Sequence, residues 1–382
     1  MYYPLVGGAE IAVKEITDRV SRGEIEFDMV TLRHDRNLPK VERIGNVTVY
    51  RVGLSKKDPT PEELVSFPVY LIKVIYPVLA FFKAFGLSMK NRYEASWAIM
   101  SYAGFPALFL RFLRGIPYIL TLQEGDSIGH ITQRWRIRLI FPLYALIFKK
   151  ADIIQTISRF LASFARGMGA TRPIVIIPNG VALEQFTREY SDGDLISLAE
   201  SLGARHETRY LVTTSRLVPK NAVDILIMAL KYVPENIELI VVGDGPDKKM
   251  LLGLTESEEV AKRVHFVGHK DISEVPRYLA VSDIFIRPSR SEGMGSSFIE
   301  AMAAGVPVIT TGVGGIADFL KDGETGVLCK VNDPKDLAEK IQMLLENDAV
   351  RLHIIATARS YVILRYDWST IVKQMKAHVF KI

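Results

Sequence analysis

Two glutamates, Glu292 and Glu300, stand eight positions apart in the stretch SEGMGSSFIE, with small residues between them. The preceding run DIFIRPS has the pattern of a buried strand and the following FIEAMAAG that of a helix, so the small residues form a strand-to-helix turn. Backbone N–H groups in the first turn of a helix lack intrahelical partners and attract anions. We therefore expect Met294, Gly295 and Ser296 to receive a diphosphate.

The two carboxylates extend this interpretation, because each can accept hydrogen bonds from ligand hydroxyls. Glu292 precedes the helix and suits the hydroxyls of a sugar. Glu300 lies further into the helix and suits a ribose, as acidic residues do in other nucleotide sites. The simpler interpretations are a surface ion pair for Glu300 and a favourable helix-dipole contact for Glu292. A sugar, a diphosphate and a ribose in one line favour a nucleotide sugar.

Three further glycine turns could approach a phosphate, although each could also be only a tight turn. They are Gly7-Gly8, the loop VVGDGPDKK at Gly243–Gly245, and Gly312–Gly315. None has the spacing of a dinucleotide fingerprint or of a P-loop, which argues against dehydrogenases and ATPases. The acidic string Asp192-Gly193-Asp194 is interpreted as a loop and not as a metal site.

Composition limits the partners and the compartment. The 382 residues are too many for one ordinary core, and 48% hydrophobic with 24% charged residues is typical of a globular protein. The net charge of +5 favours an anionic partner, such as a phosphorylated ligand or a membrane surface; nucleic acid is supported by charge alone. Cys329 is the only cysteine, which excludes an intramolecular disulfide and fits a reducing cytoplasm.

The elements that must position these residues alternate between short β-branched runs and helical patterns. Runs such as FDMVTLRH, PYILTLQEGD and ADIIQTIS come first along the chain, and PIVIIPNG, RYLVTTSRL, IELIVVGDGP and VPVITTGVGG follow. This rhythm predicts an α/β protein with two Rossmann-like doubly wound parallel sheets and a ligand in the crevice between them. The expected parts are a domain at 1–180, a linker at 181–205, a domain at 206–362, and a C-terminal helix at 363–382 that packs across the junction.

Two apolar segments with basic flanks, residues 64–87 and 134–150, could contact a membrane. Prolines and lysines interrupt the first segment, so we do not expect it to cross a bilayer. Basic flanks suit interfacial helices among anionic head groups. Two ordinary amphipathic helices packed on a sheet are the alternative. No signal peptide is expected at the N-terminus.

The order of the motifs resembles that of the retaining GT-B glycosyltransferases of the large GT4 group. The matching stretches cover most of the chain and include YPLVGGAE, IIPNGVALEQF, TSRLVPKNAVD, VVGDGP, VHFVGH, DGETGVL and SEGMGSSFIE, which fits the EX7E motif of that family. The resemblance implies the GT-B fold, transfer from a nucleoside-diphosphate sugar with retention, no cofactor beyond this co-substrate, and no metal.

The resemblance also implies roles for individual residues. Arg216 and Lys220 would neutralise the diphosphate, Glu300 would hold the ribose, and Glu292 would contact the transferred sugar, while Asp126 could accept a proton. The other donor-binding positions would be Gly7, Gly8, Gly243, Gly268, His269, Gly293, Met294, Gly295 and Ser296.

This sequence departs from the family pattern in three places. Lys220 comes four positions after Arg216, and Asn221 stands where many relatives have lysine, so either side chain could face the phosphate. Gln123 occupies a position that is histidine in many relatives, and glutamine cannot act as a base, which leaves Asp126, Glu124 or the departing phosphate. Only Met1-Tyr2 precede YPLVGGAE, so the first sheet is expected to lack a central strand.

The acceptor is expected to be a lipid-linked or cell-surface glycan precursor at the cytoplasmic face of the membrane, because both apolar segments lie in the domain at 1–180, which the resemblance implies binds the acceptor. The main alternative is a non-catalytic relative that binds nucleotide sugar or membrane without turnover. A phosphorylase would need a lysine that anchors pyridoxal phosphate, and no convincing candidate is present. A nucleotide-sugar epimerase fits the arrangement of Arg216 and GMGSS less well.

Overall fold

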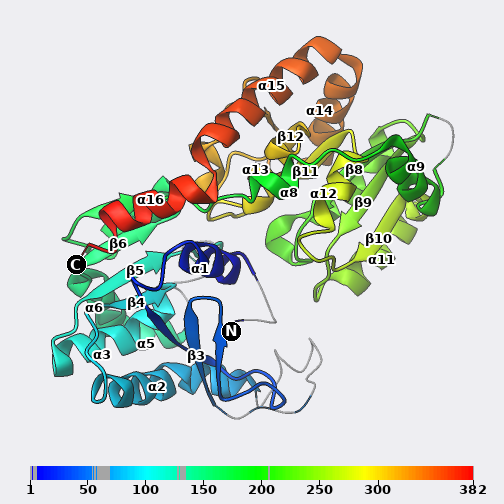
Figure 1. Cartoon of the computed structure of the whole chain (residues 1–382). Coiled ribbons are helices and arrows are strands. Elements are labelled where there is room, and N and C mark those ends of the chain that lie inside the picture. Colours follow the sequence, from blue (N-terminus) through cyan, green and yellow to red (C-terminus); the bar gives the residue numbers. More distant parts are fainter. Residues whose placement is uncertain are drawn as a thin grey trace. The chain divides into compact units, whose positions relative to one another are not determined.

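The computed structural model describes residues 2, 7–53, 55, 57, 69–126, 129, 135–204 and 207–381, which form two compact α/β units (Figure 1). The first unit comprises Met1–Glu124, Ile128–Asn179 and Trp368–Ile382. The second comprises Gly125–Ser127 and Gly180–Asp367. Each unit has its own parallel sheet and its own helices, as the alternation of strand and helix patterns predicts.

The second unit contains one parallel sheet of six strands in the order β10-β9-β8-β11-β12-β13. The strands are β8 (Arg209–Thr214), β9 (Ile237–Val242), β10 (Val264–Gly268), β11 (Ile284–Arg287), β12 (Val308–Thr310) and β13 (Val327–Leu328). The first strand of the unit therefore lies in the middle, and the order reverses between β8 and β11. In open α/β sheets, ligands bind at the carboxyl ends of the strands at such a reversal.

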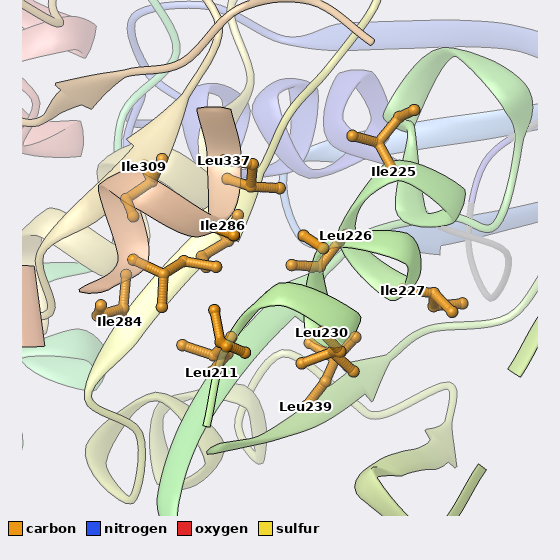
Figure 2. Packing of buried hydrophobic residues seen from close by; sticks show 14 of the residues in the cluster. Leu211, Ile225, Leu226, Ile227, Leu230, Leu239, Ile284, Ile286, Ile309 and Leu337 are labelled. Atoms are coloured by element: carbon orange, nitrogen blue, oxygen red, sulfur yellow. The ribbon is translucent and has the colours of Figure 1, made fainter. Parts of the chain in front are cut away.

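Helices cover this sheet and enclose its core. They are α8 (Leu183–Phe186), α9 (Asp192–Ser201), α10 (Val223–Ala229), α11 (Lys248–Ser257), α12 (Val275–Ala280), α13 (Ser296–Ala303), α14 (Pro334–Glu346) and α15 (Asp348–Arg365), with 3₁₀ turns η3 (Pro219–Asn221), η4 (Leu230–Tyr232), η5 (Ala261–Arg263) and η6 (Gly314–Asp318). Figure 2 shows apolar side chains of α10 packed with those of β8, β9, β11 and β12. Cys329 belongs to this core and is 7% exposed, and burial raises its pKa to about 12.

The described residues of the first unit form two sheets. The parallel sheet β4-β5-β6-β7 consists of β4 (Ser96–Ile99), β5 (Tyr118–Leu122), β6 (Ile153–Thr156) and β7 (Ile174–Ile176). In the sheet β1-β3-β2, β1 (Phe27–Leu32) runs parallel to β3 (Val47–Val52), and β2 (Val41–Ile44) runs antiparallel to it. The fully buried β5 reads YILTL, the continuous apolar pattern of a strand covered on both faces.

The helices of the first unit are α1 (Gly8–Asp18), α2 (Val69–Ser88), α3 (Gly104–Arg114), α5 (Trp135–Leu139), α6 (Phe141–Lys150), α7 (Arg159–Gly167) and α16 (Trp368–His378), with the 3₁₀ turn η2 (Ser101–Ala103). The last helix, α16, returns to this unit and contacts α1 (Figure 1). Phe380, just after it, packs against Phe27 and Trp97, with ring centroids 6.0 and 5.1 Å apart. The end of the chain is therefore part of the core of the first unit.

A cavity of about 920 Å³ separates the two sheets of this unit. All six residues of β1 and all four of β4 line it, together with residues of α1, α2 and α3. In the part of the chain that the structure describes, β1 pairs only with β3, and β4 only with β5. One edge of each strand therefore faces the cavity.

Several sequence expectations differ from the structure. Of the linker expected at 181–205, the described residues 181–204 carry α8 and α9 within the second unit. Pro77 does not end α2, which continues to Ser88, and Leu71–Ser88 is the one described segment long and apolar enough to cross a membrane by length and composition. Residues 3–6, 64–68 and Arg134, which belong to motifs discussed above, lie outside the described residues.

Candidate functional site

The candidate site lies in the loops that follow β8 and β11, the two central strands of the second unit. The loop after β8 carries Arg216 and Lys220, and the loop after β11 carries Glu292 and leads into α13. Both loops start at the carboxyl ends of neighbouring parallel strands, where the strand order reverses. This is the position at which the topology predicts a ligand.

A buried ion pair organises the loop after β11. Nη2 of Arg287, at the end of the strand, lies 2.5 Å from Oε2 of Glu292. The two side chains are only 8% and 11% exposed. Nη1 of Arg287 donates to the Ser297 hydroxyl at 2.9 Å, and the guanidinium lies over the ring of Phe298, 4.3 Å from its centroid. Arg287 therefore joins the strand, the loop and the first turn of α13.

The rest of Glu292 is also fixed by its neighbours. Its Oε1 accepts a hydrogen bond from the N–H of Gly293 at 3.0 Å, and its carbonyl accepts one from Gly315 at 3.0 Å. Gly314 has φ +58°, and a Cβ there would overlap the Glu292 carbonyl. The glycine turn at 312–315, considered above for phosphate approach, thus packs beneath the backbone of Glu292.

Gly295 allows α13 to begin beside this ion pair. Its φ of +85° is a left-handed conformation that side chains rarely adopt. A Cβ at this position would lie 2.5 Å from the Phe298 ring and 2.6 Å from Nη2 of Arg287. The helix starts at Ser296, so its unpaired N–H groups follow directly. Met294 and Gly293 are buried, whereas Gly295 and Ser296 are partly exposed.

Glu300 lies on α13, and burial raises its pKa to about 7, with the positive charge of Arg287 opposing this shift. A carboxyl group with a pKa in this range changes charge near neutrality. A ligand that donates hydroxyl hydrogen bonds favours the ionised form, because a carboxylate is a better acceptor than a carboxylic acid.

Lys220, Gly125 and Asp126 meet beside Glu292. The Lys220 ammonium lies 3.7 Å from Oδ1 of Asp126. A Cβ at Gly125 would lie 2.6 Å from Nζ of Lys220 and 3.3 Å from Oε1 of Glu292, so the absent side chain leaves room for both groups. The Ser291 hydroxyl donates to the Gly125 carbonyl at 3.2 Å. These residues all belong to the second unit.

The structure gives Asn221 and Lys220 different positions. Nδ2 of Asn221 donates to the carbonyl of Arg216 at 2.6 Å, and the asparagine is 5% exposed. Asn221 therefore braces the turn that carries Arg216. The Arg216 side chain is exposed, and no described carboxylate pairs with it. Between Asn221 and Lys220, Lys220 is therefore the side chain that offers a positive charge to the site.

The glycines of the other predicted turns in this unit allow close packing of backbones. A Cβ at Gly243, where φ is +149°, would overlap the carbonyl of Ser215, and one at Gly245 would overlap that of Leu217. The N–H of Gly243 donates to the carbonyl of Gly268 at 2.8 Å. His269, which follows Gly268, is exposed. These contacts bring the loops after β8, β9 and β10 together.

The remaining candidates lie in the first unit. Gly7 and Gly8 are exposed at the start of α1, where the N–H of Gly7 donates to the carboxylate of Glu10 at 3.0 Å. Glu124 is buried and accepts a hydrogen bond from the N–H of Ser101 at 2.6 Å, and burial raises its pKa. A residue held in this way braces the end of β5 and is poorly placed to act as an open proton acceptor.

The acidic string at residues 192–194 begins α9, where the Ser191 hydroxyl caps the helix by accepting from the N–H of Asp194 at 3.2 Å. The earlier interpretation as a loop is therefore wrong. Asp192 and Asp194 lie in the first turn of the helix, where negative charge is favourable. Within the described ranges, no group of three or more histidine, cysteine or acidic residues could hold a metal ion.

Sequence reasoning missed three polar side chains around the site. Arg287 is the charged last residue of the otherwise apolar strand IFIR, and that contrast was the available signal. The hydroxyls of Ser215 and Ser289, which follow β8 and β11, are buried and have no hydrogen-bond partner among the described residues. Two buried hydroxyls without partners at adjacent strand ends are groups that a bound ligand or water could satisfy.

Two family descriptions match the chain, and together they cover most of it. "Glycosyl transferase 4-like domain" matches residues 7–180, and "Glycosyl transferases group 1" matches residues 197–361. A curated relative is the GDP-mannose-dependent alpha-(1-6)-phosphatidylinositol monomannoside mannosyltransferase of Mycobacterium tuberculosis, 28% identical over 69% of both chains.

Two solved structures have the same fold. Sucrose-phosphate synthase from Thermosynechococcus elongatus has a TM-score of 0.81 and 23% identity, covering 97% of this chain and 92% of the other. HepE from Anabaena, in complex with UDP-glucose, has a TM-score of 0.78 and 20% identity, covering 100% and 98%.

Proposed function

Because the chain is a glycosyltransferase of the GT4 group with the GT-B fold, we propose that it moves a sugar from a nucleoside-diphosphate sugar to an acceptor hydroxyl with retention of configuration. The observation that supports this proposal most directly is the placement of cations and helix N–H groups. Arg216 and Lys220 follow β8, and the first turn of α13 follows the neighbouring β11. A diphosphate there would be stabilised by both.

The reaction breaks the bond between the anomeric carbon and the phosphate oxygen. The electron pair goes to that oxygen, so the leaving nucleoside diphosphate gains negative charge while the sugar gains positive charge. Fixed positive groups that face the developing negative charge lower the barrier. Arg216, Lys220 and the N–H groups of Gly295 and Ser296 take this role.

The acceptor hydroxyl attacks from the face that the diphosphate leaves, which retains the configuration. Its proton passes to the departing phosphate or to Asp126, whose carboxylate lies 3.7 Å from the Lys220 ammonium. Gln123 cannot accept this proton, and Glu124 is buried with its carboxylate bound to Ser101. This scheme needs no nucleophilic carboxylate and therefore no covalent intermediate.

Glu292 and Glu300 orient the donor. Glu300 accepts hydrogen bonds from the ribose hydroxyls, and Glu292 accepts them from the transferred sugar. Arg287 donates to one Glu292 oxygen and Gly293 to the other, and each carboxylate oxygen can accept a further hydrogen bond. The backbone at Gly268-His269 contacts the base, and Gly7 and Gly8 approach the donor phosphates. The positive side chains replace a metal ion in this scheme.

The acceptor that we favour is a lipid-linked or cell-surface glycan precursor at the cytoplasmic face of a membrane. The relative from Mycobacterium tuberculosis is named for a phosphatidylinositol mannoside, which supports a lipid-linked acceptor for this chain. The UDP-glucose complex of HepE supports a nucleotide-sugar donor. The net charge of +5 suits contact with anionic lipid.

The test is release of nucleoside diphosphate from a panel of UDP-, GDP- and ADP-sugars, each with and without a total lipid extract. Release from one donor that increases with lipid is the expected result, and it identifies base, sugar and acceptor class together. If folded protein releases nothing from any donor, the proposal fails and the non-catalytic alternative takes its place. A binding assay with the same donors then shows whether that alternative holds.

A further inference from the structure

Helix α2 presents apolar side chains on two opposite faces. The inner face lines the cavity of the first unit with Tyr76, Ala80, Ala84 and Leu87. The outer face carries Leu71, Ile75, Val78, Phe82 and Met89 (just past the helix), which are between 41% and 66% exposed. Spacings of three, four and seven residues place them along one side of the helix. A helix that only packs on a sheet would be polar on this side.

Helix α3 extends the exposed apolar surface. Phe109, Phe112 and Leu113 are 39%, 55% and 62% exposed. The two helices pack together, and the rings of Phe81 and Phe109 are 5.8 Å apart across their junction. We call the exposed set the α2–α3 apolar face: Leu71, Ile75, Val78, Phe82, Met89, Phe109, Phe112 and Leu113. A contiguous surface of this kind marks a partner or a membrane.

Positive charge gathers at one end of this face. Lys90 and Arg92 follow α2, Arg114 ends α3, and all three are exposed. Nη2 of Arg114 donates to the carbonyl of Ser88 at 3.1 Å, which holds this cation at the end of α2. Neither α2 nor α3 contains an aspartate or a glutamate. The face therefore combines large apolar side chains with three exposed cations at one end, on helices that carry no carboxylate.

We propose that the α2–α3 apolar face docks on the surface of an anionic bilayer. Its apolar side chains enter the boundary between head groups and acyl chains, and Lys90, Arg92 and Arg114 contact lipid phosphates. The inference rests on the membrane contact in the proposed function and assigns it to specific residues.

Helix α2 lies on the bilayer and does not cross it, because its other side is fixed in the first unit. The hydroxyl of Tyr76 donates to the carbonyl of Val30 at 2.8 Å, and the hydroxyl of Tyr102 donates to the carbonyl of Val74 at 2.9 Å. Crossing would break these bonds and place the residues of the inner face in lipid.

Lipid fits this face better than a second copy of the chain does. A second copy that docked through the same two helices would bring the same cations and no carboxylate on either helix, so these helices would offer no complementary charge. Anionic head groups supply that charge, and their attraction falls as salt increases.

The experiment is co-sedimentation of the full chain with vesicles of phosphatidylcholine alone or mixed with phosphatidylglycerol, at low and high salt. Wild type should bind the anionic vesicles and bind less at high salt. Phe82→Glu and Phe112→Glu should each weaken binding by about tenfold or more. The triple change Lys90→Gln, Arg92→Gln and Arg114→Gln should remove the salt dependence. Leu364→Glu is the matched control, since Leu364 is 75% exposed on α15 of the second unit.

Three outcomes overturn the proposal. The first is that wild type does not bind anionic vesicles at low salt. The second is that Leu364→Glu loses as much vesicle binding as Phe82→Glu. The third is that the chain forms a dimer that Phe82→Glu dissociates, while the vesicles do not bind. An assay of nucleoside diphosphate release without lipid distinguishes failure of this proposal from failure of the proposed function. Phe82→Glu should keep that release, whereas failure of the proposed function appears as no release with vesicle binding intact.

Discussion

Arg287 holds Glu292 through a 2.5 Å contact between two side chains that are almost fully enclosed by the second unit. The arginine belongs to the end of β11 and the glutamate to the loop before α13, so the contact fixes the turn between strand and helix. It also balances a negative charge that would otherwise be costly to bury. Arg287 therefore fixes the position of the Glu292 side chain and lies in contact with its carboxylate.

Breaking this pair from one side should destabilise the protein strongly. Arg287→Met leaves the Glu292 carboxylate buried without its cation, and we expect a loss of about 3–5 kcal/mol in the free energy of unfolding. The double variant Arg287→Met with Glu292→Gln should recover much of the loss, because it removes the unpaired charge. Urea unfolding of the four proteins in this cycle measures the coupling. Additive losses would show that the pair contributes nothing as a pair.

Removing the exposed cation of the loop after β8 should reduce turnover without unfolding the protein. Arg216→Ala should cost about 3 kcal/mol of transition-state stabilisation, about a hundredfold in kcat/KM. Arg209→Ala is the control, because Arg209 starts the same strand, is exposed, and pairs with Asp283 at 2.7 Å. Wild-type turnover in Arg216→Ala would remove this residue from the mechanism.

Glu300 should make stability and donor binding depend on pH in opposite directions. Its pKa is raised from 4.5 to about 7, so the folded state holds a proton that the unfolded state releases. The unfolding free energy contributed by this group should fall as pH rises from about 4.5 to 7, and Glu300→Gln should remove that slope. Affinity for the nucleoside diphosphate found in the donor panel should increase as pH rises through about 7, because the carboxylate then accepts the ribose hydrogen bonds. Titration calorimetry across this range measures it, and a flat profile in wild type would contradict the ribose role.

Gly295→Ala should damage the site more than the fold of the sheet. The added Cβ meets the Phe298 ring and the Arg287 guanidinium at a residue with φ +85°. We expect a loss of stability of about 1–3 kcal/mol and weaker donor binding. Gly253→Ala is the matched control, because Gly253 lies within α11 and a Cβ there meets nothing within 4 Å. That change should increase stability by up to about 1 kcal/mol, and equal behaviour of the two variants would show that position 295 has no special requirement.

Continuous apolar runs made most of the parallel strands predictable. IELIVV, which is apolar except for Glu238, is buried at every position in β9, as expected for a strand in a sheet covered on both faces. The strand VERI was missed, because its alternating charges suit an edge position that only the pairing with β3 defines. The continuity of α2 through Pro77 was also missed, since a proline inside a helix usually ends it.

The site was predictable where spacing along one element decides it. Glu292, Gly295 and Glu300 fall around one strand-to-helix turn, and the structure places them there. The partner of Glu292 depends on how the end of β11 faces its own loop, which periodicity does not reveal. The orientation of Asn221 toward the Arg216 carbonyl likewise follows from a tight 3₁₀ turn. The catalytic roles of these residues remain predictions.

The burial of Cys329 makes its thiol a probe for opening of the second unit. The only thiol of the chain lies in the core of that unit, 7% exposed and with its pKa raised to about 12. Thiolate, the reactive form, is therefore scarce in the native state, and a disulfide reagent can modify the protein only during local or global opening. The labelling rate then follows the opening equilibrium of the second unit alone. A nucleoside diphosphate that binds only the native state should slow this labelling in proportion to its occupancy. The labelling rate then measures the affinity for this ligand without any turnover.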